Sequence, residues 1–297
     1  MIIASQGMIL LDVNSSTAVN LLIGIIQAII LGIIQGITEF LPISSTAHLE
    51  VFTKLFHWDS FGNKPFVATI QFGSVIAVFM YFWKDINKIL FGSLRAFQKK
   101  QWNSQYWRLI VGIAVGTLPI LVFGFLLKKA LNKEDSDINS MAVIASASIA
   151  MSLLLGLAEK FGSRKRNFKQ IQVIDGILMG LGQAIALVPG SSRSGTTLTA
   201  GLFLGLDRKS AAKFSFLLGI PALTIATLYE FKEVVGKDIN LLLVLVGTIS
   251  AFIFSYISIA WLLKYLQTKN IWVFVWYRLG FGILILLGIL TNVLRNK

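Results

Sequence analysis

The sequence predicts an all-α integral membrane protein with about six transmembrane helices and two re-entrant helical hairpins. Charged residues make up 14% of the 297 positions, against roughly 25% in soluble domains. Hydrophobic residues make up 55%, and the mean hydropathy is +0.75. Several apolar runs also reach about 20 residues, the length that an α-helix needs to cross a bilayer. These observations exclude a disordered chain and argue against a soluble globule.

The apolar runs predict the order of the elements along the chain. Because backbone inside lipid must satisfy its own hydrogen bonds, each long run is expected to be a helix. Two further apolar stretches, Ala18–Leu49 and Val173–Leu206, are broken near the middle by proline and a Ser/Thr cluster, which is typical of re-entrant hairpins. The six predicted spans are 66–83, 109–127, 139–158, 214–230, 240–263 and 272–290.

The two broken stretches resemble each other. Residues 41–45 (Leu-Pro-Ile-Ser-Ser) align with residues 188–192 (Val-Pro-Gly-Ser-Ser) at an offset of 147. We therefore predict one membrane domain, built from repeat units at about 18–158 and 172–290. Three spans separate the hairpins, and because three is odd, the second unit is expected to be inverted relative to the first. Such repeats usually place the functional site near the membrane midplane.

Lysine and arginine are distributed unevenly over the predicted loops. If segment 84–108 faces the cytoplasm, sixteen of the 27 basic residues fall in inner loops and nine in outer segments. The positive-inside rule favours this orientation, with both termini outside. The net charge of +13 is then expected to meet membrane lipids and not nucleic acid, because the basic residues occur in short blocks between apolar runs.

The composition excludes several classes of site. The chain has no cysteine and only two histidines, so disulfides and the usual zinc clusters are ruled out. Neither a Walker motif nor a dinucleotide fingerprint occurs, so no organic cofactor is expected. No basic residue precedes Lys54, so the N-terminal apolar residues are not expected to form a cleaved signal peptide.

The first hairpin carries a carboxylate at predicted membrane depth. Gln35 and Glu39 are four residues apart, which places both on one face of a helix. Because charge is costly inside a membrane, Glu39 indicates a functional site; the alternative is a neutralised, structural side chain. A proline should end this helix. The hydroxyl residues that follow, Ser44, Ser45 and Thr46, could cap the next helix or contact a phosphate group.

Two histidines occur near this motif. A lone histidine is usually a satisfied polar residue, so His48 is a catalytic candidate only because Glu39 and the hydroxyl residues are close by. His57 lies in a predicted loop and receives no role.

The second hairpin contains the most specific motif of the chain, Pro-Gly-Ser-Ser-Arg-Ser-Gly-Thr-Thr at 189–197. Glycine and serine allow a turn whose N–H groups point at an anion, and the helix that follows adds its positive end. Arg193 offers planar donors that suit phosphate oxygens. Its counter-anion is either a phosphate ligand or Glu39, in a structural pair. The substrate-binding candidates here are Gly190, Ser191, Ser192, Ser194, Gly195 and Thr197.

Together the two motifs resemble the undecaprenyl-diphosphate phosphatase family, the bacitracin-resistance proteins of bacterial membranes. Residues 35–48 match its Glu/Gln-x-x-x-Glu pattern followed by Phe-Leu-Pro-x-Ser-Ser-Thr, and residues 189–195 match its Pro-Gly-x-Ser-Arg-Ser-Gly pattern. The likeness continues at 214–218 and 277–278 and covers nearly the whole chain. Gln35 is a departure, because many members have Glu there, and a glutamine cannot supply a second carboxylate.

The resemblance implies an enzyme of the bacterial inner membrane that hydrolyses undecaprenyl diphosphate to the monophosphate and so recycles the lipid carrier for peptidoglycan synthesis. It also implies an active site that faces outward. The positions of this chain that fall on family active-site positions are Glu39, Ser45, His48, Ser192, Arg193 and Thr197.

The chemistry expected from these residues is phosphoanhydride hydrolysis. Ser45 is the predicted nucleophile, with Glu39 or His48 accepting its proton; attack by water activated by Glu39 is the alternative. Arg193 and the backbone amides of 191–195 are expected to stabilise the phosphoryl oxygens. A divalent cation, Mg²⁺ or Ca²⁺, is compatible with Glu39 as its main ligand. The remaining substrate-binding candidates are Gln35, Ser44 and Thr46.

A transporter or flippase of a polyprenyl-phosphate lipid is the competing interpretation, because inverted repeats with broken hairpins also build secondary transporters. A carrier needs binding groups but no nucleophile, so the grouping of Glu39, Ser45 and Arg193 argues against it. Arg278 lies in the last apolar run, where the sequence favours a structural role over a site role. The sequence is compatible with a monomer or an oligomer.

Overall fold

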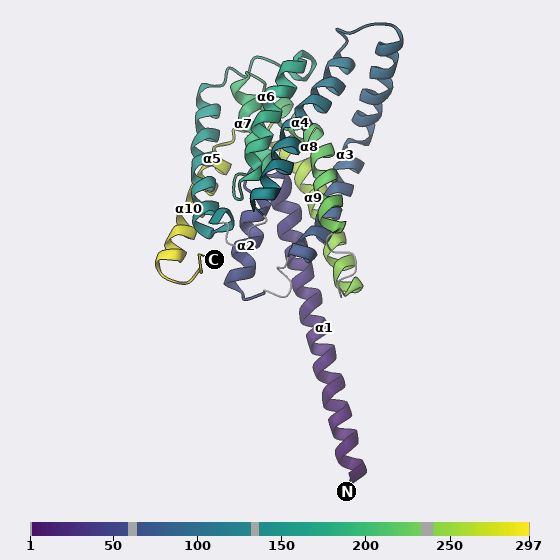
Figure 1. Ribbon diagram of the computed structural model, residues 1–297, viewed down its shortest axis with the longest axis vertical. Coiled ribbons are helices and arrows are strands. Elements are labelled where there is room, and N and C mark those ends of the chain that lie inside the picture. The colour runs from purple at the N-terminus through teal and green to yellow at the C-terminus, as the bar shows by residue number, and fades with distance from the viewer. Residues whose placement is uncertain (1, 59–63, 132–136, 233–239, 297) are drawn as a thin grey trace.

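The computed structural model describes residues 2–58, 64–131, 137–232 and 240–296, and this part of the chain is a bundle of α-helices without a β-strand (Figure 1). This confirms the predicted all-α membrane class. The helices are α1 (Ile2–Phe40), α2 (Ser45–Leu55), α3 (Lys64–Gln98), α4 (Gln105–Leu131), α5 (Met141–Phe161), α6 (Val173–Ala184), α7 (Arg193–Phe203), α8 (Arg208–Lys232), α9 (Leu241–Tyr265) and α10 (Trp272–Leu290), with 3-10 turns η1 (Asp137–Asn139), η2 (Phe168–Gln170) and η3 (Ile185–Leu187). Parts of the predicted outer segments, 59–63, 132–136 and 233–239, lie outside the described residues.

Seven helices of the described part are long and apolar enough to cross a membrane, one more than the sequence predicted. Six of them overlap the six predicted spans, but α3 continues to Gln98, so the first part of the predicted inner loop 84–108 is helical. The additional one, Val19–Phe40, is the first arm of the predicted first hairpin; no proline or charge interrupts it before Glu39. The matching arm of the second hairpin, Val173–Leu187, is a shorter apolar helix. The re-entrant course of the two hairpins stays a prediction.

Each hairpin turns where a proline interrupts the chain. α1 ends at Phe40, two residues before Pro42, and η3 ends at Leu187, two residues before Pro189. Proline lacks the N–H that continues a helix, and its ring clashes with the preceding turn. The chain therefore leaves its helix at these two points.

Both turns end on a serine with a positive φ, a conformation that residues other than glycine rarely adopt. Ser44 (φ 77°, ψ 102°) precedes α2, and Ser192 (φ 69°, ψ 113°) precedes α7. Each serine side chain accepts a hydrogen bond from the N–H three residues further on, which caps the new helix. The two turns therefore align at an offset of 148, and not at the 147 that the sequence pattern predicted.

The helices that flank the hairpins pair in a corresponding way. α1 packs against α9 and α6 against α4, while α3 lies against α8 and α5 against α10 (Figure 1). The first two contacts are made through small residues. A Cβ on Gly32 would overlap the carbonyl oxygen of Gly247, and a Cβ on Gly180 would overlap that of Gly116. Glycine at these positions lets the helix backbones approach closely.

The predicted inner loops gather at one end of the bundle. An ion pair between Lys213 and Asp85 (2.6 Å) joins two of them. At the other end, the N–H of Met141, at the start of α5, donates to the carbonyl oxygen of Asn296 (3.0 Å) in the predicted outer C-terminal segment. Figure 1 shows the two chain ends on the side opposite to the connection between α3 and α4. The two ends of the bundle thus correspond to the two predicted sides.

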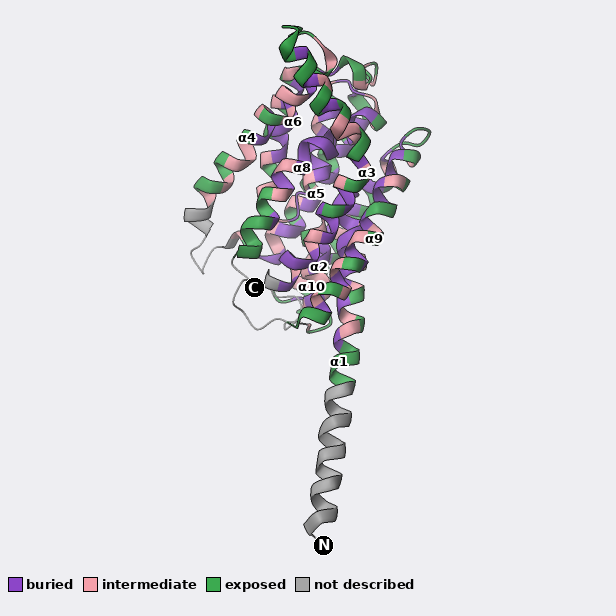
Figure 2. Cartoon of the chain, turned by 90° about the vertical axis from the view of Figure 1, so that its right-hand side faces the viewer, coloured by how far each residue is buried: buried purple, intermediate pink, exposed green. Residues whose placement is uncertain are grey.

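The outer faces of the bundle are apolar. Figure 2 shows buried residues in the centre of the bundle and exposed residues along the outer faces of its helices. Large apolar side chains are among the exposed ones, for example Phe125, Leu126 and Trp276. Soluble proteins rarely expose extended apolar surface, whereas lipid accommodates it.

Ion pairs anchor the base of the second hairpin. Arg166 donates two hydrogen bonds to the buried carboxylate of Asp175, near the start of α6 (2.8 and 2.5 Å). These bonds raise the pKa of Arg166 above its ordinary value, so the arginine stays charged. Glu159 of α5 is buried as well and pairs with Arg208 at the start of α8 and with Arg164. The loop ends of α5, α6 and α8 are therefore tied to neighbouring charged residues.

Candidate active site

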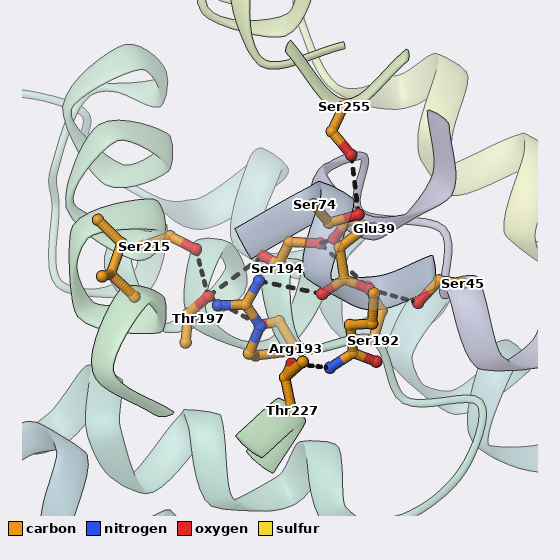
Figure 3. A network of polar contacts seen from close by, with 12 residues as sticks. Glu39, Ser45, Ser74, Ser192, Arg193, Ser194, Thr197, Ser215, Thr227 and Ser255 are labelled. Carbon is orange, nitrogen blue, oxygen red and sulfur yellow. Dashed lines mark hydrogen bonds and ion pairs between the residues drawn. The ribbon is translucent and has the colours of Figure 1, made fainter. Parts of the chain in front are cut away.

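Glu39, in the last turn of α1, lies where the tips of the two hairpins meet (Figure 3). Only 8% of its side chain is exposed. Its Oε2 accepts hydrogen bonds from Ser45 Oγ (2.7 Å) and Gln35 Nε2 (3.2 Å), and its Oε1 pairs with Arg193 Nη2 (3.2 Å). Three donors thus satisfy a carboxylate whose burial would otherwise be costly. Because Ser45 belongs to the first hairpin and Arg193 to the second, Glu39 joins the two.

Ser45 is the first residue of α2 and is partly exposed. Its hydroxyl donates to Glu39, and a hydrogen bond of this length is the arrangement that a general base needs in order to activate a nucleophile. The positive φ of Ser44 places Ser45 at the start of the helix, beside Glu39, six residues earlier in the chain.

Arg193 is the first residue of α7 and lies directly on Gly219 of α8. A Cβ on Gly219 would overlap the guanidinium, so a side chain at this position would displace Arg193 from where it lies. One side of the guanidinium binds Glu39, while the buried Nε has no protein partner in the described part of the chain. An arginine has five N–H donors, so donors remain for a phosphate group.

The tip of the second hairpin is fixed against the first by Ser194. Its hydroxyl lies within hydrogen-bonding distance of the carbonyl oxygens of Glu39 (3.3 Å) and Leu41 (3.0 Å). Of the predicted anion-binding amides, that of Gly195 donates to the Ser192 side chain, and that of Ser191 donates to a backbone carbonyl. The first-turn N–H groups of α7 at 193 and 194 are the better candidates, because such groups lack partners within their helix.

Arg278 of α10 holds both hairpin turns from one side. It is fully buried, and its guanidinium donates to the carbonyl oxygens of Pro42 (3.0 Å), Gly190 (2.9 Å) and Ser191 (3.0 Å). The first of these belongs to the first hairpin and the other two to the second. This structural role was favoured from the sequence, but its partners were not predictable. The available signal was an arginine within an apolar run.

His48 lies apart from the three groups that surround Glu39. Its Nδ1 is 2.7 Å from the carbonyl oxygen of Ser44, and its Nε2 is 2.7 Å from the hydroxyl of Tyr277. Its ring is also stacked on Phe281 of α10, with centroids 4.1 Å apart. Both ring nitrogens are thus engaged away from Ser45, so the geometry favours Glu39 as the proton acceptor. Apart from the polarity of the two residues, nothing in the sequence indicated the contact between His48 and Tyr277.

The other candidate residues divide into three groups. Thr46 is exposed on α2 and forms no side-chain hydrogen bond within the described part of the chain. Thr197 is fully buried and binds the carbonyl oxygen of Arg193 (2.8 Å) and the hydroxyl of Ser215, so it braces α7 against α8. The residues that shape the two turns through their backbone or caps are Ser44, Gly190, Ser191 and Ser192.

The protein by itself does not build a cage for a cation. No three Asp, Glu or His side chains lie together within the described ranges, and Glu39 is already bound by three donors. One carboxylate together with the phosphate oxygens of a substrate is, however, a usual arrangement for Mg²⁺. The donor set therefore fits a cation only in company with a phosphorylated ligand, with Glu39 as the protein ligand.

Comparisons with known proteins identify the family of the chain. The family model described as "Bacitracin resistance protein BacA" matches residues 28–284. A protein of Thermosynechococcus vestitus named undecaprenyl-diphosphatase is 53% identical over 257 residues, which cover 86% of this chain and 93% of the relative. Proteins of the same name from Trichodesmium erythraeum (49% identical; 92% and 88% covered) and Trichormus variabilis (53%; 92% and 86%) are also similar. The matched range includes the turns of both hairpins, and the chain belongs to the BacA family of bacitracin resistance proteins.

Proposed function

We propose that this chain is an intramembrane phosphatase that hydrolyses undecaprenyl diphosphate to the monophosphate and inorganic phosphate. The observation that carries the proposal is the triad at the meeting point of the hairpins: the Ser45 hydroxyl on one oxygen of Glu39 and the Arg193 guanidinium on the other. A nucleophile, a proton acceptor and a positive charge lie within one hydrogen-bonded group. The shared name of the relatives supplies the substrate.

In the first step, Ser45 Oγ attacks the terminal phosphorus of the diphosphate and transfers its proton to Glu39. The bond between that phosphorus and the bridging oxygen breaks, and the polyprenyl monophosphate leaves with the bridging oxygen. Arg193 binds the phosphoryl oxygens on which negative charge develops, assisted by the first-turn N–H groups of α7. Glu39 passes its proton to water before the second step.

In the second step, water attacks the phosphorylated Ser45. Glu39, again a carboxylate, takes the proton of this water, while the bond between phosphorus and Ser45 Oγ breaks. The serine oxygen regains a proton from Glu39, and inorganic phosphate leaves. The same base thus serves both halves of the reaction, as microscopic reversibility requires. A cation bound with the substrate at Glu39 would supply further positive charge to the phosphoryl oxygens.

The proposal includes a location and an architecture. The chain lies in the bacterial cytoplasmic membrane with the basic loops 84–108, 159–171 and 207–213 inside, supported by the excess of lysine and arginine there. The diphosphate reaches the site from outside. The two halves, about 18–158 and 172–290, are copies of one unit in opposite orientations, supported by their equivalent turns and helix pairs.

Phosphate release from a polyprenyl diphosphate by the purified full-length protein tests the function. Wild-type protein is expected to release phosphate, whereas Ser45→Ala and Arg193→Ala are expected to lose at least about 10²-fold in rate. Rates that survive both substitutions would reject this site. Movement of the lipid across liposomes without phosphate release would reject the enzyme in favour of the carrier.

A further inference from the structure

α3 carries an amide at membrane depth that the mechanism above does not use. Gln71 is partly exposed, and its Nε2 donates to Oγ1 of the fully buried Thr227 in α8 (2.9 Å). Within the described ranges this is the one hydrogen bond of the Gln71 side chain. Its oxygen and its second N–H are therefore free for another partner. An amide at this depth is costly unless it meets water, protein or ligand.

The alignment of the two hairpins locates Gln71 relative to the site. At the offset of 148 set by Ser44 and Ser192, the equivalent of Gln71 is Gly219. Phe66 and Phe214, both buried, keep this offset on α3 and α8. Gly219 is the residue on which the Arg193 guanidinium lies. By the same relation, the position of Gln71 relative to Ser45 corresponds to that of Gly219 relative to Arg193.

The two halves differ in which element carries the long side chain, the hairpin or the helix packed against it. In the second half, a long side chain on the hairpin, Arg193, lies on a residue without a side chain, Gly219. In the first half, the hairpin supplies the short Ser45, and α3 supplies the long Gln71. Each half can thus supply N–H donors to the space before its hairpin. In the second half they come from Arg193 on the hairpin, and in the first half from Gln71 on α3.

The polar face of α3 supports this placement. Ser74, one turn beyond Gln71, is fully buried and accepts a hydrogen bond from Ser255 of α9 (2.8 Å). Figure 3 includes Ser74 and Thr227 in the close view of the site with Glu39, Ser45 and Arg193. Ser74 is fully buried against Ser255, whereas Gln71 is partly exposed and has a second N–H without a protein partner in the described part of the chain.

We infer that Gln71 is a further substrate-contacting residue, whose amide donates to a phosphoryl oxygen of the diphosphate on the Ser45 side of the site. The inference rests on the proposed function. Thr227 orients the amide by accepting one of its N–H groups, and the other N–H is directed to the substrate. Arg193 then binds the diphosphate from the second half and Gln71 from the first.

The test uses full-length protein in detergent, with KM and kcat measured for phosphate release from a polyprenyl diphosphate. Gln71→Met keeps the length of the side chain but removes its donors. We expect kcat/KM to fall by roughly 10- to 100-fold, chiefly through KM, with an unchanged thermal unfolding midpoint. Gln71→Glu, which places a negative charge before the phosphate, is expected to lose more. Gln267→Met, an exposed amide after α9, is the matched control.

A purely structural role gives a different result. If Gln71 only links α3 to α8, then Gln71→Met and Thr227→Ala lower the unfolding midpoint and leave kcat/KM within twofold of wild type, which overturns the inference. If Gln71→Met does not fold, Thr227→Ala decides, because release of the amide should raise KM several-fold. If the wild type releases no phosphate, the proposed function fails instead. Protection of the wild type, but not of Gln71→Met, against thermal unfolding by inorganic pyrophosphate then tests Gln71 separately, and equal protection rejects it.

Discussion

The tips of the two hairpins share one backbone turn and carry different chemistry. Ser44 and Ser192 have nearly the same φ and ψ angles and cap α2 and α7 in the same way. The first residue of the helix that follows is Ser45 in one hairpin and Arg193 in the other, and both bind Glu39. One turn geometry therefore presents a hydroxyl from one side and a guanidinium from the other to a single carboxylate.

The helical arms that precede the two turns also differ in the polar contacts of their equivalent residues. At the offset of 148, Gln35 corresponds to Gln183, and both amides are buried. Gln35 donates to Glu39, whereas the side chain of Gln183 has no protein partner in the described part of the chain. The residue one turn later explains this difference, because Leu187 stands at the position that corresponds to Glu39. The carboxylate belongs to the first hairpin alone.

The bases of the hairpins differ as well. The second hairpin is anchored by the pairs of Asp175 and Glu159 with arginines, and both carboxylates are buried. In the first hairpin the carboxylate of Glu50, which pairs with Lys54, is much more exposed than these two. Buried ion pairs therefore anchor the hairpin that supplies the positive charge of Arg193, while the other hairpin supplies the reacting groups Glu39 and Ser45.

The largest effect is expected from the one carboxylate that the hairpins share. Glu39→Gln keeps the shape of the side chain but cannot accept the Ser45 proton, so phosphate release should fall by about 10²- to 10⁴-fold. Glu50→Gln, an exposed carboxylate on the same hairpin, should stay within twofold of wild type. A Glu39→Gln protein of near-normal rate would show that the asymmetry of the hairpins has no catalytic meaning.

The second-largest effect is expected at Arg278, which binds the turns of both hairpins. Arg278→Met leaves three buried carbonyl oxygens without their donor, and we expect the free energy of unfolding to fall by about 3–5 kcal/mol. The rate of phosphate release should fall as well, because both turns are released. Denaturation in detergent and activity assays measure the two effects. Arg295→Met, at an exposed arginine, is the control. Equal stability of the two variants would contradict the proposed role of Arg278 in holding the two turns.

The bases of the hairpins should differ in stability by a smaller amount. Asp175→Asn removes a buried partner of Arg166 and should cost about 2 kcal/mol of unfolding free energy, since Arg166 is partly exposed. Glu50→Gln at the first hairpin should cost less than about 0.5 kcal/mol. Hydrogen exchange should then rise in α6 for Asp175→Asn and stay unchanged in α2 for Glu50→Gln. The opposite ranking would refute the unequal anchoring.

The smallest effects are expected at the two equivalent glutamines. Gln183→Met removes a buried amide that has no partner among the described residues, so unfolding free energy should rise by about 1 kcal/mol, with activity unchanged. Gln35→Met removes a donor from Glu39 and should lower kcat by roughly tenfold. Thermal midpoints and kcat measured in parallel separate the two outcomes. Similar behaviour of both variants would mean that the arms are functionally alike.

The local chemistry of the site was predictable from the sequence because it rests on short-range patterns. Gln35 and Glu39 share a helix face by their spacing, prolines end the helices, and an arginine in an apolar stretch requires an anion. The six main spans followed from apolar length alone. The offset between the repeats was one residue off, because serines are adjacent in both motifs and only the positive φ shows which serine is the cap.

The sequence by itself determined the membrane class, six of the long helices, the family and the candidate residues of the site at Glu39. Only the tertiary structure decided which of them touch: Ser45 and Arg193 bind the carboxylate, while His48 turns to Tyr277 and Thr197 to Ser215. It also gave Arg278 its three carbonyl partners. The physical reason is that helix formation and membrane insertion depend on residues near in sequence, whereas contacts between side chains of different helices depend on how the helices pack.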